Sequence, residues 1–584
     1  MGGICMKYIS QKWEEKYDGI LYFFQRLEEM LFHYTIDIFI APVHNTKTLL
    51  EEYISVQQDT AKKGVGIYNL EQIRDELVFS IIHDKVLQAK LGNETIELLA
   101  KQIKNNNSSV IAYLNRKISK GEYLEWCISY LKEHVVNHSH KEEIEFALRT
   151  WISLIIWYGY SQEQIYNDLH RLFSQKISDP YEALSQFIER YSFRENQYKV
   201  YYVFNGYYKK YRELLSTQMM ISFENDSFTQ NIVIKRKNDF VGAFEVKAID
   251  KHNALKKGYS IILLLEQFIH ALSNEKREMI RSTGMVRDLS KEDDCEFIRI
   301  KNPGSKAIFD DTLIQNEETI NYVIVGYLRS NKNTRGLLSN AIKLHNSANA
   351  QLVPKEAFIE LWSMLEALVI TGPCDSKIEL LTSKILPMIQ DNYMREYFSE
   401  IDTGIQNNIS SQEYQELLKD ITIGKYNIDK LMYMVFLPEY EGVLERCFSL
   451  LKQYPIIRHK MYTMYSIRNK TSDVYKKQSN YANRIKWHLY RLYRARNALV
   501  HSGDTHRHIE VLGRHLHAYC DKILIDVMLK ISSDSTMQTI EDVFCDGNLR
   551  FLSMRRMATI NDPITTEIIE EINKSFFILP NGYR

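Results

Sequence analysis

Glycine and proline are scarce in this chain, whose 584 residues include only 23 Gly and 10 Pro. This scarcity excludes a collagen-like repeat and a chain made mostly of low-complexity linkers. Long hydrophobic runs are lacking too, since stretches such as 261–265 fall far short of the roughly 20 apolar residues that span a bilayer. Helix breakers this rare in so long a chain favour a largely helical protein.

Neither sign of charge is in excess, with 74 basic and 74 acidic residues. A zero balance excludes a generally basic nucleic-acid coat, although it leaves room for a local basic site. The seven cysteines are widely spaced and form no CxxC pair, which suits free thiols in a reducing compartment. Because the N-terminus does not look like a signal peptide, we expect a cytoplasmic protein with no membrane partner.

Periodicity divides the chain into four parts. Apolar side chains recur at helical spacing over 1–195, β-branched and aromatic runs appear over 196–335, the helical pattern returns over 336–531, and 532–584 are mixed. We therefore predict a mainly α protein. Its parts are a helical N-terminal domain, an α+β middle domain, a helical bundle and a C-terminal extension.

Local signals mark several element boundaries. Short β-rich runs predict strands over 200–204, 219–223, 232–234, 240–249 and 295–300. Asp250 is a suitable N-cap for a long helix over 252–272. Gly159 is suited to end one helix, and Ser161 with Gln164 to begin the next.

Two groups of histidines have the composition of a metal site without its arrangement. They are His134, His138 and His140 in one segment, and His506, His508, His515 and His517 in the other. The first group has no cysteine or carboxylate at ligand spacing, and the second is spread over a turn and the following helix. Solvated or weakly polar roles are favoured for both, and we predict neither a metal nor another cofactor.

Residues 481–503 form the segment that differs most from its surroundings. The pattern predicts an amphipathic helix with an apolar face formed by Ile485, Leu489, Leu492, Leu499 and Val500. At ~100° per residue, Arg496 falls within ~20° of Leu489, in the middle of that face. Arg494 points ~140° away and is expected to be solvated.

A guanidinium on an apolar face is unfavourable unless it meets an anion. Asn497 borders the same face, and His501 lies where Ser502-Gly503 is expected to stop the helix. One interpretation is a binding site at the helix end for an anionic substrate. The other is a structural ion pair inside the bundle, for which Glu366 in the segment 358–368 is the candidate partner.

The run Arg496-Asn497-Ala498-Leu499-Val500-His501 resembles the signature of the HEPN superfamily of ribonucleases, in which a polar residue follows the Arg and a His comes a few residues later. The upstream LWSMLEAL segment is similar to an early helix of many HEPN domains. A further helix is expected after the motif, with apolar residues at Ile509, Leu512, Leu516, Ile523 and Val527. The resemblance covers roughly 336–531.

This resemblance implies a HEPN helical bundle that cleaves RNA without a metal. Arg496, Asn497 and His501 would be the catalytic residues, and a homodimer would bring two motifs to one cleft. Arginine binds phosphate through its planar, permanently charged fork, and histidine transfers protons near neutral pH. Arg491, Arg494 and Arg507 are the expected RNA-binding residues, and Glu366 is the expected structural support.

Large HEPN proteins of this kind resemble prokaryotic anti-phage effectors that act by abortive infection. The substrate would be cellular or phage RNA, tRNA included, and the N-terminal region would respond to a phage or host protein. Two alternatives stay open. One is a non-catalytic HEPN scaffold that binds RNA or a protein, and the other is a helical adaptor in which Arg496 forms a bundle ion pair.

Overall fold

The computed structural model places two compact units in the chain. The larger unit combines Met1–Trp151 with Pro303–Arg584, and the smaller one is Ile152–Asn302. The structure describes all residues except 1–7, 33–44, 64–66, 137–139, 220, 224–237, 274–276, 292–293, 300–316, 352, 371, 373–374, 504–505, 507 and 575–584. The division differs from the four predicted parts, because the N-terminal helices and the C-terminal bundle belong to one unit.

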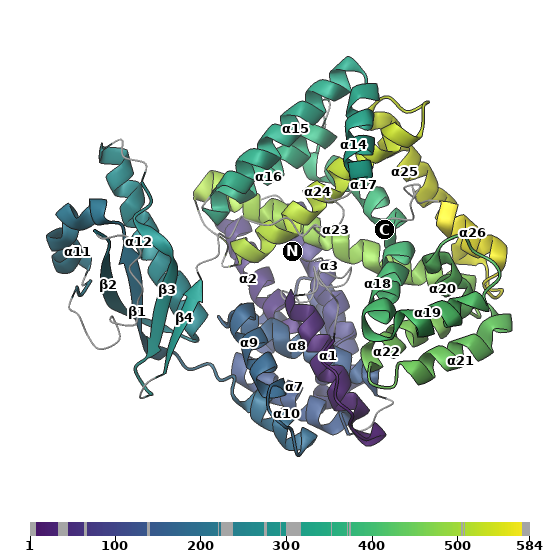
Figure 1. The fold of residues 1–584 in the computed structure, drawn as a ribbon, viewed down its shortest axis with the longest axis horizontal. Helices are drawn as coiled ribbons and strands as arrows, with labels where there is room; N and C mark the ends of the chain where they lie inside the picture. The colour runs from purple at the N-terminus through teal and green to yellow at the C-terminus, as the bar shows by residue number, and fades with distance from the viewer. Residues whose placement is uncertain are drawn as a thin grey trace. The chain divides into compact units, whose positions relative to one another are not determined.

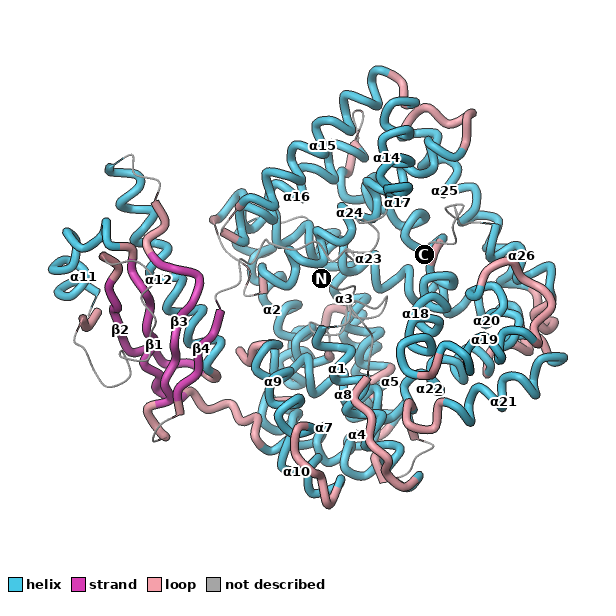
Figure 2. Tube along the Cα trace, viewed as in Figure 1, coloured by secondary structure: helices cyan, strands magenta, loops and turns pink. Residues whose placement is uncertain are grey.

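The larger unit is helical throughout its described part (Figure 1, Figure 2). Its first half contains η1 (Glu15–Tyr17), α1 (Asp18–Phe32), α2 (Thr46–Lys63), α3 (Ile67–Ile82), α4 (Lys85–Leu91), α5 (Asn93–Lys104), α6 (Ser108–Lys117), α7 (Lys120–His134) and most of α8 (Lys141–Trp157). Its second half contains α14 (Glu317–Arg329), α15 (Lys332–Ala350), α16 (Pro354–Val369), α17 (Lys377–Asp391), α18 (Tyr393–Asn408), α19 (Ser411–Lys419), α20 (Asn427–Phe436), η4 (Pro438–Tyr440), α21 (Glu441–Leu450), α22 (Pro455–Tyr465), α23 (Thr471–Ser502), α24 (Ile509–Ser533), α25 (Ile540–Met554), η5 (Arg555–Thr559) and α26 (Thr566–Lys574). The prediction of a mainly α protein is confirmed.

The core of the larger unit surrounds α23, which packs against α3, α16, α17 and α24. At ~1.5 Å per residue its 32 residues extend for about 48 Å. The helix therefore joins the N-terminal helices to the C-terminal bundle. None of the described helices combines the length and apolar character that crossing a membrane requires.

The smaller unit combines a four-stranded antiparallel sheet with helices. The sheet has the order β2-β1-β3-β4, and Val200 at its centre pairs with Phe244 on one side and Val286 on the other. The strands are β1 (Asn196–Phe204), β2 (Phe240–Ala248), β3 (Ile280–Asp288) and β4 (Cys295–Arg299). The helices are α9 (Gln162–Phe173), α10 (Pro180–Glu189), η2 (Gly206–Tyr211), α11 (Arg212–Met219) and α12 (Lys251–Ser273).

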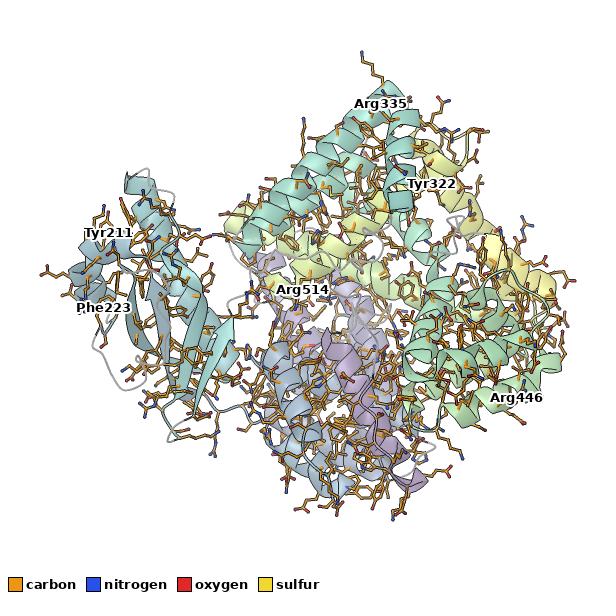
Figure 3. The ribbon with its side chains drawn as sticks, viewed as in Figure 1. Tyr211, Phe223, Tyr322, Arg335, Arg446 and Arg514 are labelled. Carbon is orange, nitrogen blue, oxygen red and sulfur yellow. The ribbon has the colours of Figure 1, made fainter. Side chains whose placement is uncertain are left out.

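One face of this sheet is covered by α12. The shared core contains Tyr202 and Phe244 from the sheet and Leu255 and Ile262 from the helix, all buried. Tyr211 and Phe223, labelled in Figure 3, pack at the margin of that core. The unit therefore has a hydrophobic core of its own.

The predicted boundaries agree with the structure at several points. Gly159 adopts φ +122° after α8, Ser161 caps α9 by accepting from the Gln164 N–H, and Asp250 accepts from the Asn253 N–H at the start of α12. Strands were correctly predicted over 200–204, 240–249 and 295–300.

Two other strand predictions fare differently. The run 219–223 begins at the end of α11, and only Ser222 forms an isolated bridge, to Ala243. The run 232–234 lies outside the described residues. Conversely, β3 was not predicted, because Arg281, Gly284 and Arg287 interrupt its apolar pattern. A Cβ on Gly284 would come within 2.5 Å of Leu255 Cδ1 on α12, so a larger residue there would require the Leu255 side chain to shift.

Candidate functional site

The end of α23 carries the residues singled out by the sequence. Gly503 adopts φ +68° and donates its N–H to the Ala498 carbonyl, which ends the helix in the left-handed conformation that glycine favours. The predicted stop is therefore confirmed. His501, in the last turn, is exposed, and its ring has no hydrogen bond or ion pair with another described residue.

The predicted apolar face of α23 is correct except at its end. Ile485, Leu489, Leu492 and Leu499 are buried, whereas Val500 is 46% exposed. The assignment of Val500 to the packed face was therefore wrong. Val500 points ~100° away from the buried Leu499 around the helix.

Arg496 is held loosely at this helix end. Its Nη1 donates to Asn497 Oδ1 at 3.1 Å, and its side chain is 23% exposed. Glu366 on α16 is the one carboxylate within ion-pair distance among the described residues, with Oε2 3.7 Å from Arg496 Nη2. The other oxygen, Glu366 Oε1, is buried without a hydrogen-bond partner. The guanidinium thus keeps donors available on its accessible side.

Arg491 and Arg494, by contrast, lie in the interior and not on a substrate surface. Arg491 is 1% exposed and donates to Glu52 on α2 at 2.8 Å and to Glu76 on α3 at 2.9 Å. Arg494 donates to the second oxygen of Glu52 at 2.6 Å. The predicted solvation of Arg494 was wrong, because α2 and α3 cover the face of α23 that periodicity alone assigned to solvent.

The carboxylate between these two arginines has an unusual pKa. Burial alone raises the pKa of Glu52, but the charges of Arg491 and Arg494 outweigh burial and hold it at about 2. Glu52 is therefore ionised at neutral pH, and both guanidinium groups have an anion beside them. Arg507, the third expected RNA-binding residue, lies outside the described residues.

The helices around the motif form the predicted bundle. Trp362 of the LWSMLEAL segment lies on α16 and contacts Tyr493 of α23, with ring centroids 5.8 Å apart. The residues expected on the following helix are all buried on α24: Ile509, Leu512, Leu516, Ile523 and Val527. The two predicted neighbours of the motif helix, α16 and α24, thus pack against α23 and against each other.

The two histidine groups stay together only in part, as the His134 and His140 rings lie 5.3 Å apart and the His506 and His508 rings 6.0 Å apart. His134 Nδ1 lies 2.8 Å from the Tyr130 carbonyl oxygen, and His138 lies outside the described residues. In the second group, His515 Nδ1 lies 3.1 Å from His488 Nε2 on α23, while His517 faces α15. Burial lowers the pKa of His488 to about 3, with Arg491 adding to the effect, so this ring is neutral.

An open cleft in the larger unit was missed by the sequence analysis. It encloses about 1220 Å³, open solvent included. Its lining combines tyrosines with more cations than carboxylates: Tyr22, Arg26, Lys85, Glu142, Glu145, Phe146, Arg149, Tyr393, Tyr397, Ile456, His459, Lys460, Thr463, Lys477, Asn480, Tyr481 and Arg484. No local sequence signal marks this cleft, because its walls come from segments that are hundreds of residues apart.

The helix end itself combines a permanent cation, an amide and an exposed imidazole. Such a set can bind a phosphate and move a proton without a metal. Neither a protein-family model, nor a curated protein, nor a solved structure matches this chain.

Proposed function

We propose that this chain is a metal-independent endoribonuclease of the HEPN type, with Arg496, Asn497 and His501 as its catalytic residues. The observation that carries the proposal is a contrast along α23. Arg491 and Arg494 are tied to carboxylates at 2.6–2.9 Å, whereas Arg496 is partly exposed and has one carboxylate at 3.7 Å. A purely structural arginine would be expected to resemble the first two.

The chemistry requires one group for charge and one for proton transfer. Arg496 binds the scissile phosphate and stabilises the negative charge that builds up as the 2′-oxygen attacks phosphorus. His501 accepts the 2′-hydroxyl proton. The bond from phosphorus to the 5′-oxygen then breaks, and the proton that His501 accepted is returned to the 5′-oxygen, leaving a 2′,3′-cyclic phosphate and a 5′-hydroxyl. Asn497 orients the guanidinium through the hydrogen bond that its Oδ1 accepts.

Helix geometry favours a composite site in a homodimer. Asn497 and His501 are four residues apart and share a face of α23, but Arg496 and His501 are five apart and diverge by ~140°. One phosphate is therefore poorly placed to meet both Arg496 and His501 of the same protomer. A second copy supplies the missing group, as the resemblance implies.

The biological role rests on the resemblance. We propose a cytoplasmic anti-phage effector that cleaves cellular or phage RNA, tRNA included, and halts growth by abortive infection. The remaining parts of the chain would restrain the site until a phage or host protein releases it.

The direct test is RNA cleavage by purified wild-type protein and its variants in EDTA. We expect Arg496→Ala and His501→Ala each to lower the cleavage rate by 10² or more, on the order that single electrostatic or proton-transfer groups contribute. Wild-type products should carry 2′,3′-cyclic phosphate and 5′-hydroxyl ends. Melting temperatures of the variants should stay near that of the wild type.

Lys476→Ala is the matched control, since it removes one positive charge from an exposed position on the same helix, about 30 Å away at ~1.5 Å per residue. It should cleave at the wild-type rate. If Arg496→Ala cleaves RNA as fast as Lys476→Ala does, the assignment of the active site is wrong.

A further inference from the structure

Three side chains with metal-binding chemistry converge between α15 and α24. His345 Nε2 lies 2.5 Å from Asp521 Oδ1 and 2.9 Å from His517 Nε2. His517 Nε2 lies 3.6 Å from the same Asp521 oxygen. Among the described residues, these three form a group whose ligand atoms all lie within 4.8 Å of one another.

Hydrogen bonds within this cluster do not satisfy all of its polar atoms. At 2.9 Å the two Nε2 atoms share at most one proton, and both also approach a single carboxylate oxygen. Asp521 is only 4% exposed, and its Oδ2 is buried without a hydrogen-bond partner. A buried acceptor without a hydrogen-bond partner is unfavourable. A cation among the three side chains would remove that deficit.

A fourth residue is placed to orient one of the ligands. Asn349 Nδ2 lies 3.3 Å from His345 Nδ1. A half-turn of the amide would bring Oδ1 to the same place, where it would accept from Nδ1–H and leave the Nε2 lone pair directed at the cluster. Metal-binding histidines usually have such a partner on the other ring nitrogen.

We propose that His345, His517 and Asp521 bind a divalent transition metal ion, with Zn²⁺ as the expected ion. Two imidazole nitrogens and one carboxylate suit Zn²⁺ or Fe²⁺, whereas Mg²⁺ and Ca²⁺ prefer oxygen ligands. His517 and Asp521 are four residues apart on one face of α24, and His345 approaches from α15. The ion therefore clamps α15 onto α24.

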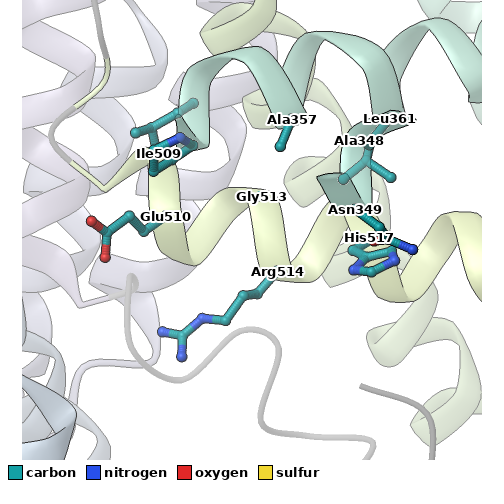
Figure 4. A pocket seen from close by; sticks show the side chains of 10 residues that line it. Ala348, Asn349, Ala357, Leu361, Ile509, Glu510, Gly513, Arg514 and His517 are labelled. Atoms are coloured by element: carbon teal, nitrogen blue, oxygen red, sulfur yellow. The ribbon is translucent and has the colours of Figure 1, made fainter. Parts of the chain in front are cut away.

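One of the three proposed ligands also lines a neighbouring pocket. His517 and Asn349 also line a pocket of about 400 Å³, open solvent included. Figure 4 shows these two residues together at one end of the pocket and Ile509 with Glu510 at the other. Ligand atoms bound tetrahedrally to one zinc at ~2.1 Å lie about 3.4 Å apart, so binding requires His345 to rotate slightly away from Asp521.

The proposal is independent of the proposed RNA cleavage, and its test does not use activity. Full-length protein is stripped with a chelator and then titrated with Zn²⁺ by calorimetry and with Co²⁺ by visible absorption. We expect one ion per chain, a higher melting temperature with Zn²⁺, and Co²⁺ bands typical of nitrogen and oxygen ligands.

Variants separate this site from binding elsewhere on the chain. Asp521→Asn and His345→Gln should weaken Zn²⁺ binding by 100-fold or more, and Asn349→Ala by about 10–100-fold. Asn346→Ala, an exposed neighbour on α15, is the matched control and should bind as the wild type does.

Two outcomes would overturn the proposal. One is wild-type protein that takes up no ion and gives no Co²⁺ bands at about ten micromolar metal. The other is undiminished binding by Asp521→Asn, which would place the ion at surface histidines. Should a ligand variant fold poorly, Asn349→Ala decides the matter, because it keeps all three ligands; affinity equal to that of Asn346→Ala would count against the site.

Discussion

Three arginines on one helix have different environments that their sequence spacing does not reveal. Periodicity placed Arg496 in the middle of the packed face, whereas in the structure its side chain is only partly buried, beside Glu366. The same arithmetic assigned Arg494 to solvent, but in the structure its side chain is largely buried and pairs with Glu52. A helical angle gives the direction of a side chain but not what packs there, and here the partner Glu52 is more than 400 residues away in the chain.

The histidines show the same limit. His517 and Asp521 stand at i and i+4 in the sequence, a spacing visible without any structure. His345, which completes the cluster, is 172 residues from His517. Local pattern therefore offers two of the three proposed ligands, and only the packing of α15 on α24 supplies the third.

At the residue scale, His488 predicts a pH dependence of stability. Its folded pKa of about 3 lies below the ~6.5 of an unperturbed imidazole, so between these values the unfolded state binds more protons. Stability is therefore greatest above the unfolded pKa and falls as the pH falls through that window. We expect His488 to account for a loss on the order of 2 kcal/mol between about pH 7 and about pH 5.

Denaturant unfolding at both pH values measures this loss. His488→Gln keeps a polar side chain beside Tyr519 and His515 but does not titrate. The variant should start less stable and lose less stability on acidification. Parallel curves for variant and wild type would rule out His488 as the source.

At the element scale, strong local signals located the helices and strands well. Caps at Ser161 and Asp250 and the stop at Gly503 were correctly identified because each depends on a few adjacent residues. The strand β3 was missed because Gly284 interrupts its pattern. This glycine lies close to Leu255 of α12, a contact that no short stretch of sequence reveals. Local sequence patterns do not predict contacts of this kind between elements.

The contact between α14 and α24 gives a prediction for a matched pair of glycines. A Cβ on Gly326 would lie 1.9 Å from the Met528 carbonyl oxygen, whereas one on Gly336 in α15 meets nothing within 4 Å. Gly326→Ala must therefore push α14 away from α24 and should destabilise the protein by roughly 1–3 kcal/mol or more, as overpacking does. Gly336→Ala should be neutral or stabilise by about 0.5–1 kcal/mol.

Thermal unfolding of the two variants beside the wild type tests this contrast. The expected order of melting temperatures is Gly326→Ala lowest, with Gly336→Ala equal to or above the wild type. A Gly326→Ala protein as stable as Gly336→Ala would mean that α14 does not pack against α24 in this way.

At the scale of the whole molecule, the four predicted parts became two units. Composition correctly marked the change to an α+β texture, but it carries no information about which helical parts pack together. The buried pairs of Arg491 with Glu52 and Glu76 join the first and last thirds of the chain. The helix that carries the candidate motif thus packs against residues outside 336–531.

This arrangement predicts that 303–584 does not fold alone. Without α2 and α3, Arg491 loses both carboxylates, and breaking a buried pair is unfavourable by roughly 3–5 kcal/mol. We expect 303–584 to aggregate when expressed by itself and to become soluble when co-expressed with 1–151. Size-exclusion chromatography should show the two fragments eluting together.

Glu52→Gln combined with Glu76→Gln in the shorter fragment should weaken that complex, since the double variant removes both charges that face Arg491. Cooperative unfolding of isolated 303–584 as a stable monomer would contradict the prediction.

The long sequence separation of these pairs also matters while the protein is being made. Glu76 precedes Arg491 by 415 residues, which at ~5–20 residues per second corresponds to about 20–80 s of translation. During that interval the N-terminal helices have left the ribosome without the helix that completes their core. A nascent chain in this condition exposes apolar surface that can aggregate. We therefore expect its folding in cells to depend on chaperones that bind it during synthesis.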